Sequence, residues 1–166
     1  MNAQLRQRIA VSLLAVSAAG FSAWKASEGY TDHAVIPTEG DVPTIGHDGR
    51  LVKMGDQITA QRAEVLARNL MTQDEQRFAA SLPGVKLHQA EFDLYMDFVG
   101  QYGIGTWRQS SMRRELLAGN YIQACKSLLK YRYAARFDSS TPGNKRCWGV
   151  WSRQLKRYEQ CMAVQS

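Results

Sequence analysis

The amino-acid sequence predicts a mainly helical α+β protein, in which a small β-hairpin near the N-terminus precedes a helical C-terminal lobe. Gly and Pro gather between Glu28 and Gly49, where Pro37 and Pro43 exclude helix and the glycines permit tight turns. From Thr59 onward, apolar residues recur at helical spacing. The 166 residues, of which 45% are hydrophobic, are enough for one buried core and too few for two comfortable domains.

An apolar segment at the N-terminus comes before this domain. Arg6 and Arg8 are followed by an uncharged run from Ile9 to Trp24. Its serines and alanines make this run less hydrophobic than a typical membrane-spanning segment. As a helix this run is ~24 Å long, shorter than the ~30 Å hydrocarbon core of a bilayer. The basic residues place their end in the cytoplasm and the rest of the protein outside the inner membrane. We therefore expect export, with a helix that holds the membrane only weakly.

The residues alone leave two fates open for this segment. Val16-Ser17-Ala18 is a small-residue cleavage site, so the segment is either a cleaved signal peptide or a retained signal-anchor helix. A soluble amphipathic helix is disfavoured because the run has no charged face. We divide the chain into this N-terminal segment, residues 1–26, and a domain of residues 27–166.

The remaining elements follow from apolar spacing and from breaks at glycine and proline. Thr59 is a natural N-cap for a long helix that Pro83-Gly84 ends. A second helix ends at Gly103 and Gly105, two shorter helices separate at Gly119-Asn120, and a last amphipathic helix follows a turn-rich stretch. The side chains expected to face the core are Val65, Leu66, Leu70 and Phe78, then Phe92, Tyr95, Met96, Val99 and Tyr102, and finally Trp148, Trp151 and Leu155.

Charge and cysteine content narrow the class of partner. The net charge of +6 and the pI near 9.4 favour an anionic partner: nucleic acid, lipid headgroups or an acidic cell-wall polymer. Export makes nucleic acid the least suitable of these. For an exported chain we expect one disulfide, Cys125 to Cys161, and a leftover thiol at Cys147. The alternative is three reduced thiols.

Few residue patterns offer chemistry. His33, His47 and His88 lack metal-ligand spacing, and there is no nucleophile elbow, P-loop or dinucleotide motif, so we expect neither cofactor nor metal. Glu28 sits where a helix meets an irregular segment, and Asp41 and Thr44 fall on the expected hairpin. A helix end facing a hairpin forms a cleft of the kind that glycoside hydrolysis requires. Solvated turn acids are the simpler alternative.

The stretch "EGYTDHAVIPTEGDVPTIGHDG" resembles the active-site segment of the phage lysozymes, glycoside hydrolase family 24, where Glu-Gly is followed by a β-hairpin ending in Thr-Ile-Gly. The resemblance continues through "FDLYMDFVGQYGIGTWRQSSMRRELLAGNYIQAC" and "NKRCWGVWSRQLKRYEQC", which are similar to the family's later helices. It covers most of the chain from Glu28 to Cys161. The resemblance implies a lysozyme-like fold.

The same resemblance implies roles for four residues. Glu28 matches the general acid, and Thr44 matches the hairpin threonine that helps to position the attacking water. The family has an aspartate, or sometimes a cysteine, six residues before that threonine, where this sequence has Thr38. Either Thr38 positions the water without a charge, or Asp41 or Glu39 substitutes from the turn. We favour Asp41, for which the alternative is a turn cap.

A subgroup of these enzymes carries a signal-anchor-release segment, and Ile9 to Trp24 resembles one. The resemblance implies a monomeric muramidase that cleaves the β-1,4 linkage between N-acetylmuramic acid and N-acetylglucosamine. Such an enzyme is exported to the host periplasm, tethered to the inner membrane, and released to lyse the cell. The rivals are a hydrolase of chitin-like chains and, since the second carboxylate is missing, a catalytically inactive wall-binding or membrane-anchored structural protein.

Overall fold

The computed structural model describes residues 7–166 except residues 38, 48 and 51. The chain divides into two compact units. The first is Ala15–Arg77, and the second contains Phe78–Ser166 together with the N-terminal residues up to Leu14. Each unit has its own buried residues.

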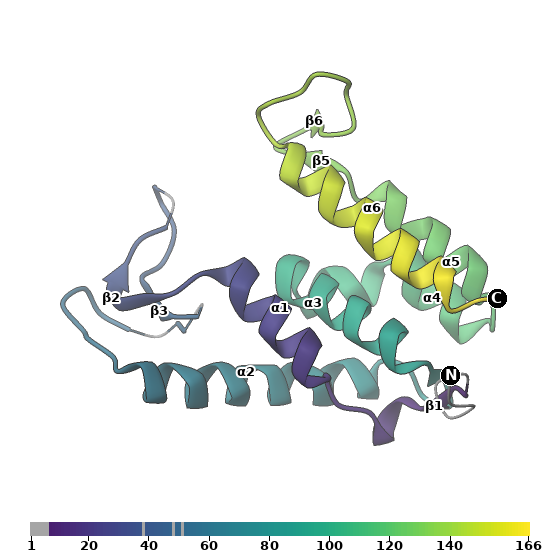
Figure 1. Cartoon of the computed structure of the whole chain (residues 1–166), viewed down its shortest axis with the longest axis horizontal. Coiled ribbons are helices and arrows are strands. Elements are labelled where there is room, and N and C mark those ends of the chain that lie inside the picture. Colours follow the sequence, from purple (N-terminus) through teal and green to yellow (C-terminus); the bar gives the residue numbers. More distant parts are fainter. Residues whose placement is uncertain (1–6, 38, 48, 51) are drawn as a thin grey trace. The chain divides into compact units, whose positions relative to one another are not determined.

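The first unit combines two helices with a hairpin (Figure 1). Helix α1 (Ala18–Glu28) begins at Ser17, whose side chain accepts a hydrogen bond from the Gly20 amide at 3.0 Å. Strands β2 (Thr31–Val35) and β3 (Thr44–Gly46) pair antiparallel and form the predicted hairpin. Helix α2 (Ala60–Ala80) begins after Thr59, which accepts from the Arg62 amide at 3.3 Å, so the predicted N-cap is confirmed.

The buried face of α2 agrees only in part with the prediction. Phe78 is buried as predicted, but the other buried residues are Ala63, Ala67 and Met71, and Val65 is 60% exposed. The reason is the close approach of β3, because a Cβ added at Gly46 would lie 3.1 Å from the Cβ of Ala63. Small side chains therefore occupy the contact, and the larger Val65 is left outside.

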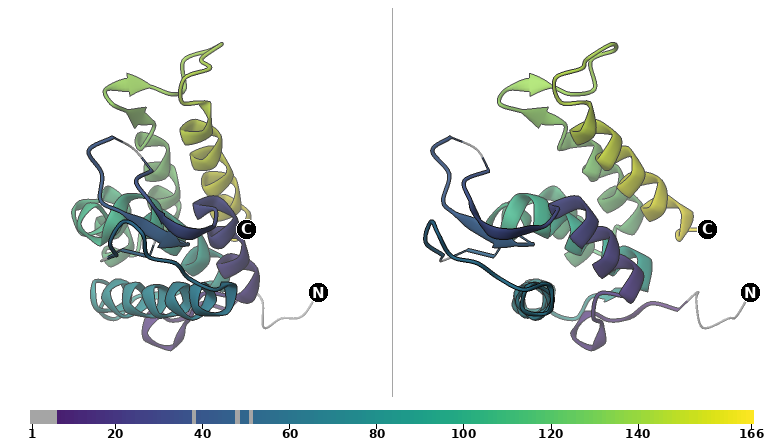
Figure 2. Two further views of the ribbon diagram at one scale, coloured as in Figure 1. Left: turned by 90° about the vertical axis from the view of Figure 1, so that its left-hand side faces the viewer. Right: turned by 60° about the vertical axis from the view of Figure 1, so that its left-hand side comes forward.

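The second unit contains the helical lobe. Its helices are α3 (Gln89–Gln109), α4 (Ser111–Leu117), α5 (Tyr121–Ser127) and α6 (Trp148–Ala163), with the 3-10 turns η2 (Val11–Leu13) and η3 (Leu128–Lys130). Its short strands are β1 (Ile9–Ala10), β4 (Lys86–Leu87), β5 (Tyr133–Ala134) and β6 (Phe137–Asp138). The break between α4 and α5 falls at the predicted Gly119-Asn120. Figure 2 shows the β5–β6 hairpin beside the first turn of α6.

An aromatic cluster forms the core of the second unit. Trp107 has no exposed surface, and its ring centroid lies 4.8 Å from that of Phe78 and 5.3 Å from that of Tyr95. The Trp107 Nε1 donates to the Ser81 hydroxyl at 2.8 Å, which satisfies its buried polar atom. The predicted disulfide is present, because Cys125 of α5 is bonded to Cys161 of α6, and Cys147 is free.

One prediction for the later helices is confirmed and one was wrong. The helix predicted to end at Gly103 breaks there, because Gly103 has a non-helical φ of 84° and ψ of 158°, and a second helical segment of α3 continues to Gln109. In α6, Trp148 is 50% exposed, and the buried residues are Gln154, Arg157 and Cys161. Asp97 explains the buried arginine: its Oδ2 accepts from the Arg157 Nε at 2.7 Å.

The N-terminal residues are integrated into the second unit. Ile9 pairs with Leu87 and Ala10 with Lys86, and the Val11 amide donates to the Val85 carbonyl at 3.1 Å. The run from Ile9 to Trp24 is therefore β1, η2, a non-helical link and the start of α1, rather than the single helix expected from the sequence. The expected segment also includes residues 1–6, which lie outside the described residues. In the part of the chain that the structure describes, no helix combines the length and apolar character needed to cross a membrane.

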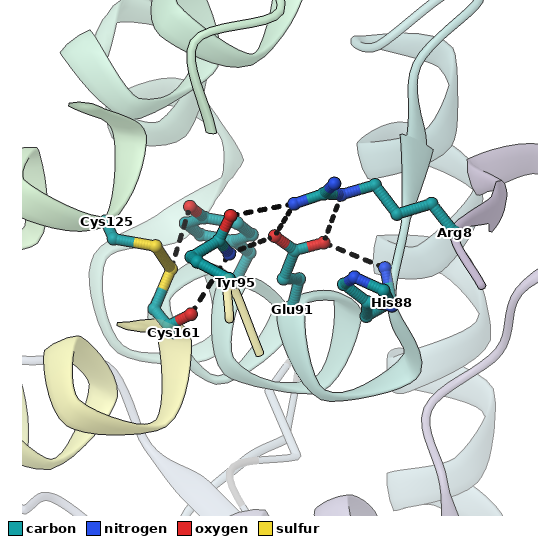
Figure 3. The surroundings of a disulfide bond; sticks show 7 residues. Arg8, His88, Glu91, Tyr95, Cys125 and Cys161 are labelled. Atoms are coloured by element: carbon teal, nitrogen blue, oxygen red, sulfur yellow. Dashed lines mark hydrogen bonds and ion pairs between the residues drawn. A yellow bond between two sulfur atoms is a disulfide. The ribbon is translucent and has the colours of Figure 1, made fainter. Parts of the chain in front are cut away.

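Figure 3 shows the contacts of Arg8 within this unit. Its Nε and Nη2 each lie 3.2 Å from one carboxylate oxygen of Glu91, which is fully buried. The same carboxylate accepts from the His88 amide at 2.8 Å and from the Gln165 side chain at 2.6 Å. The Glu91 side chain therefore connects the N-terminal segment, the start of α3 and the C-terminal end of the chain.

Candidate active site

Glu28 is the last residue of α1. The helix ends there because Gly29 follows with φ 73°, a left-handed conformation that glycine adopts without strain. The Gly29 amide donates to the Lys25 carbonyl at 3.1 Å and closes the last turn. Glu28 is partly exposed and has an interaction partner. Its carboxyl thus lies at the junction of helix and hairpin predicted from the sequence.

Thr44 is the first residue of β3 and lies opposite Val35 of β2. It is 8% exposed. The pairing is irregular between Thr31 and Val35, where β2 has more residues than its partner. Ile45 and Gly49 exchange two backbone hydrogen bonds of 2.8 Å, in which the amide of each residue donates to the carbonyl of the other. These bonds stiffen the end of β3.

Glycine is required at position 49 by the same close pairing. A Cβ there would lie 2.7 Å from the Ile45 carbonyl oxygen and would overlap the Leu66 side chain of α2. The strand that starts at Thr44 is therefore fixed to α2 by tight contacts. These contacts leave little freedom for the backbone that carries Thr44.

The three candidates for the missing carboxylate position lie in the turn between β2 and β3. Asp41 and Glu39 are both exposed. The Asp41 Oδ1 accepts a hydrogen bond from the Val42 amide at 2.8 Å, an arrangement typical of a turn aspartate. Thr38 lies outside the described residues. Which of the three holds the water stays a prediction.

Other charged groups of this unit were missed in the sequence. The hydrogen bond with the His33 ring, at 2.7 Å, lowers the pKa of Asp32. The hydrogen bond from Lys25 of α1 lowers the pKa of Glu64 of α2. Asp32 and His33 are adjacent in the sequence, so their pairing could have been predicted. Lys25 and Glu64 lie on two different helices, and no local pattern in the sequence indicates their contact.

His47 was also missed. Its Nδ1 lies within hydrogen-bonding distance of the Gly29 carbonyl, and its ring packs against Tyr30 with centroids 5.4 Å apart. The contacts of His47 thus connect the residue that follows Glu28 to the residue that follows β3, the strand that begins at Thr44. A carboxyl on a helix end and a hydroxyl on a rigid strand are groups that can donate a proton and orient a water.

Comparisons with known proteins place this chain in a family. Residues 25–161 match the phage lysozyme family. The endolysin of Bacillus phage B103 is 31% identical over 152 residues, which cover 87% of this chain and 51% of that protein. The chain thus spans about half the length of this relative. The endolysin of Salmonella phage P22 is 28% identical over 129 residues, covering 75% of this chain and 88% of that protein.

A solved structure supports the fold. A crystal structure of a P22 lysozyme mutant has a TM-score of 0.71 and 20% sequence identity, and the match covers 90% of this chain and 99% of that one. At this identity the likeness concerns the fold, which is the mainly helical α+β lysozyme-like fold. Because the family match covers residues 25–161, most of the chain, this chain belongs to the phage lysozyme family.

Proposed function

We infer that this protein is an endolysin, a muramidase that hydrolyses the β-1,4 linkage between N-acetylmuramic acid and N-acetylglucosamine in peptidoglycan. The observation that carries this function is the family match over residues 25–161, which includes the whole segment from Glu28 to Thr44. Two similar proteins named endolysins support the same activity. Hydrolysis of the glycan strands causes lysis of the host cell.

Glu28 is the general acid that protonates the leaving oxygen of the glycosidic bond. Its place at the end of α1, where the helix meets the hairpin segment, supports this role. Thr44 orients the attacking water. Asp41 takes the position of the family's second carboxylate, and its exposure in the turn leaves it free to face a substrate.

The distribution of charge suits an anionic wall polymer. The stretch of the second unit that includes the β5–β6 hairpin has four exposed basic residues: Lys130, Arg136, Lys145 and Arg146. Asp138 in the same stretch is paired with Arg132 at 3.1 Å. Four cations therefore remain available to the peptide carboxylates of peptidoglycan.

The N-terminal segment, residues 1–26, is retained in the mature protein and tethers it to the inner membrane before release into the periplasm. The contacts of Arg8 and β1 support retention. Cleavage after Ala18 would remove both, and the fully buried Glu91 would lose its cation. The released enzyme acts as a monomer, with residues 27–166 as its catalytic domain.

A turbidity assay tests the function. Purified protein added to permeabilised cells should clear the suspension and release reducing ends from purified sacculi. Chitin oligomers serve as the matched substrate, and they should be cleaved far more slowly. Tight binding to sacculi without new reducing ends would instead indicate an inactive wall-binding protein.

A further inference from the structure

His47 connects the hairpin to the end of α1. Its Nδ1 faces the Gly29 carbonyl, and since a carbonyl only accepts, Nδ1 carries the proton of this bond. The ring packs on Tyr30, with an angle of 46° between the planes. The Tyr30–His47 contact lies one step beyond the pair Thr31 and Gly46, so it extends the hairpin ladder by one position toward α1.

The two peptide groups after Glu28 are held from opposite sides. The Gly29 amide bonds to the Lys25 carbonyl within α1, and the Gly29 carbonyl accepts from His47 of the hairpin. A Cβ at Gly29 would meet nothing within 4 Å, so no described atom packs against that side of the residue. A glycine with φ 73° is otherwise a flexible joint.

The hairpin side of this bond is rigid. His47 directly follows β3. The backbone of β3 lies close to α2 at Gly46, and its Ile45 is hydrogen-bonded to Gly49. Thr44 lies on the same strand, three residues before His47. The side chain of His47 therefore ties the backbone that carries Glu28 to the backbone that carries Thr44.

We propose that His47 is a positioning residue of the hydrolytic reaction: its bond to the Gly29 carbonyl holds the Glu28 carboxyl in register with the water oriented from β3. This inference rests on the proposed function. Without the bond, rotation at Gly29 moves the acid away from the glycosidic oxygen. A displacement of about 1 Å at a reacting group lowers a rate by up to ~10²-fold.

Two substitutions separate the hydrogen bond from the ring contact. His47→Asn places an amide nitrogen on the same Cγ that carries Nδ1, so it keeps the donor and loses the ring. His47→Phe keeps a ring against Tyr30 and loses the donor. His33→Phe is the control, because His33 lies on the same hairpin but pairs with Asp32 instead of α1.

The test measures kcat and KM for release of reducing ends from soluble glycan strands, with the melting temperature of each variant. We expect His47→Phe to lower kcat by about 10- to 100-fold while KM changes less than about 2-fold. His47→Asn should recover most of the lost kcat, and His33→Phe should match the wild type. Hydrogen exchange of the Gly29 amide should be faster in His47→Phe than in His47→Asn.

Wild-type kcat in His47→Phe, or an equal loss in His47→Phe and His47→Asn, would overturn the positioning role. A loss of kcat that follows the melting temperature in both variants would do the same, since it would make His47 only a stabilising residue. These results leave the proposed function intact, because the wild type remains active in the same assay. A wild type that releases no reducing ends would overturn both.

Discussion

The guanidinium of Arg8 lies against the carboxylate of Glu91, although the two residues are separated by 83 positions in the sequence. The Glu91 side chain has no exposed surface, while that of Arg8 is 28% exposed. Arg8 also donates to the Gln165 side chain at 2.7 Å and stacks over the Tyr121 ring, 3.7 Å from its centroid. A residue that flanks the apolar segment is thus the cation of a buried ion pair.

Replacing Arg8 by alanine should destabilise the protein. Removal of one partner of a buried ion pair lowers the free energy of unfolding by about 3–5 kcal/mol. We expect a loss of about 3 kcal/mol, because the Glu91 carboxylate keeps its hydrogen bonds from His88 and Gln165. For a chain of this size that corresponds to a fall of about 6–12 °C in melting temperature, measurable by circular dichroism. Arg77→Ala, which removes an exposed pair with Asp74, is the control and should change stability by less than ~1 kcal/mol. Equal melting temperatures for the two variants would contradict the role of Arg8.

Asp97 should make stability depend on acid pH. Burial would raise its pKa, but hydrogen bonds and charges from Arg153 and Arg157 outweigh this and hold the pKa below the usual 3.8. A carboxyl with a lowered folded-state pKa stabilises the fold above its unfolded pKa, and this contribution is lost as pH falls through the folded value. The wild type should therefore exceed Asp97→Asn in melting temperature at pH 7, and the gap should narrow as pH falls below about 4. A gap independent of pH would show that the Asp97 charge does not contribute.

The turn of the hairpin should contain the second polar group of the site. We expect Asp41→Asn to lower activity by at least about 10²-fold, and Glu39→Gln to lower it less. The asparagine keeps an oxygen for the bond from the Val42 amide, so the substitution removes charge without changing the turn. Thr44→Ala should also lower activity, as measured by release of reducing ends. Full activity of Asp41→Asn together with loss of activity in Thr38→Val would assign the water to Thr38 instead.

The apolar N-terminal segment should control the timing of lysis. Ala19 and Ser22 are exposed in α1, so leucine at both positions leaves the folded unit unchanged. Each leucine favours membrane insertion by about 0.3–0.6 kcal/mol, which together shifts a balanced equilibrium by roughly 3- to 8-fold. The double variant should remain in the membrane pellet and lyse cells late, whereas glutamine at both positions should release early. Unchanged timing, or a mature chain that starts after Ala18, would contradict membrane tethering.

Local signals in the sequence were sufficient for much of the fold. The hairpin, the Thr59 N-cap and the Gly119-Asn120 break each depend on a few adjacent residues, and the structure confirms all three. The match to the phage lysozyme family likewise confirms the resemblance that the motifs around Glu28 indicated.

The features that were missed depend on contacts between distant residues. Helical spacing identified α2 and α6 but not all of the residues that they bury. In α2 the exposed Val65 is as apolar as its buried neighbours, and in α6 the buried residues include the polar Gln154 and Arg157, which apolar spacing does not mark. The bond from His47 to Gly29 joins residues 18 positions apart and has no motif of its own. The run from Ile9 to Trp24 has helical composition, yet its first residues pair with β4, a partner that only the tertiary fold provides.

The product of the reaction tests the central claim most directly. Sacculi digested with the wild type or with Glu28→Gln are reduced with borohydride, and the sugar at each new reducing end is identified. The wild type should yield muramitol, and Glu28→Gln should yield it at a rate lower by about 10²–10⁴-fold with an unchanged circular dichroism spectrum. Glucosaminitol as the product, or a wild-type rate in Glu28→Gln, would contradict a muramidase that uses Glu28 as its acid.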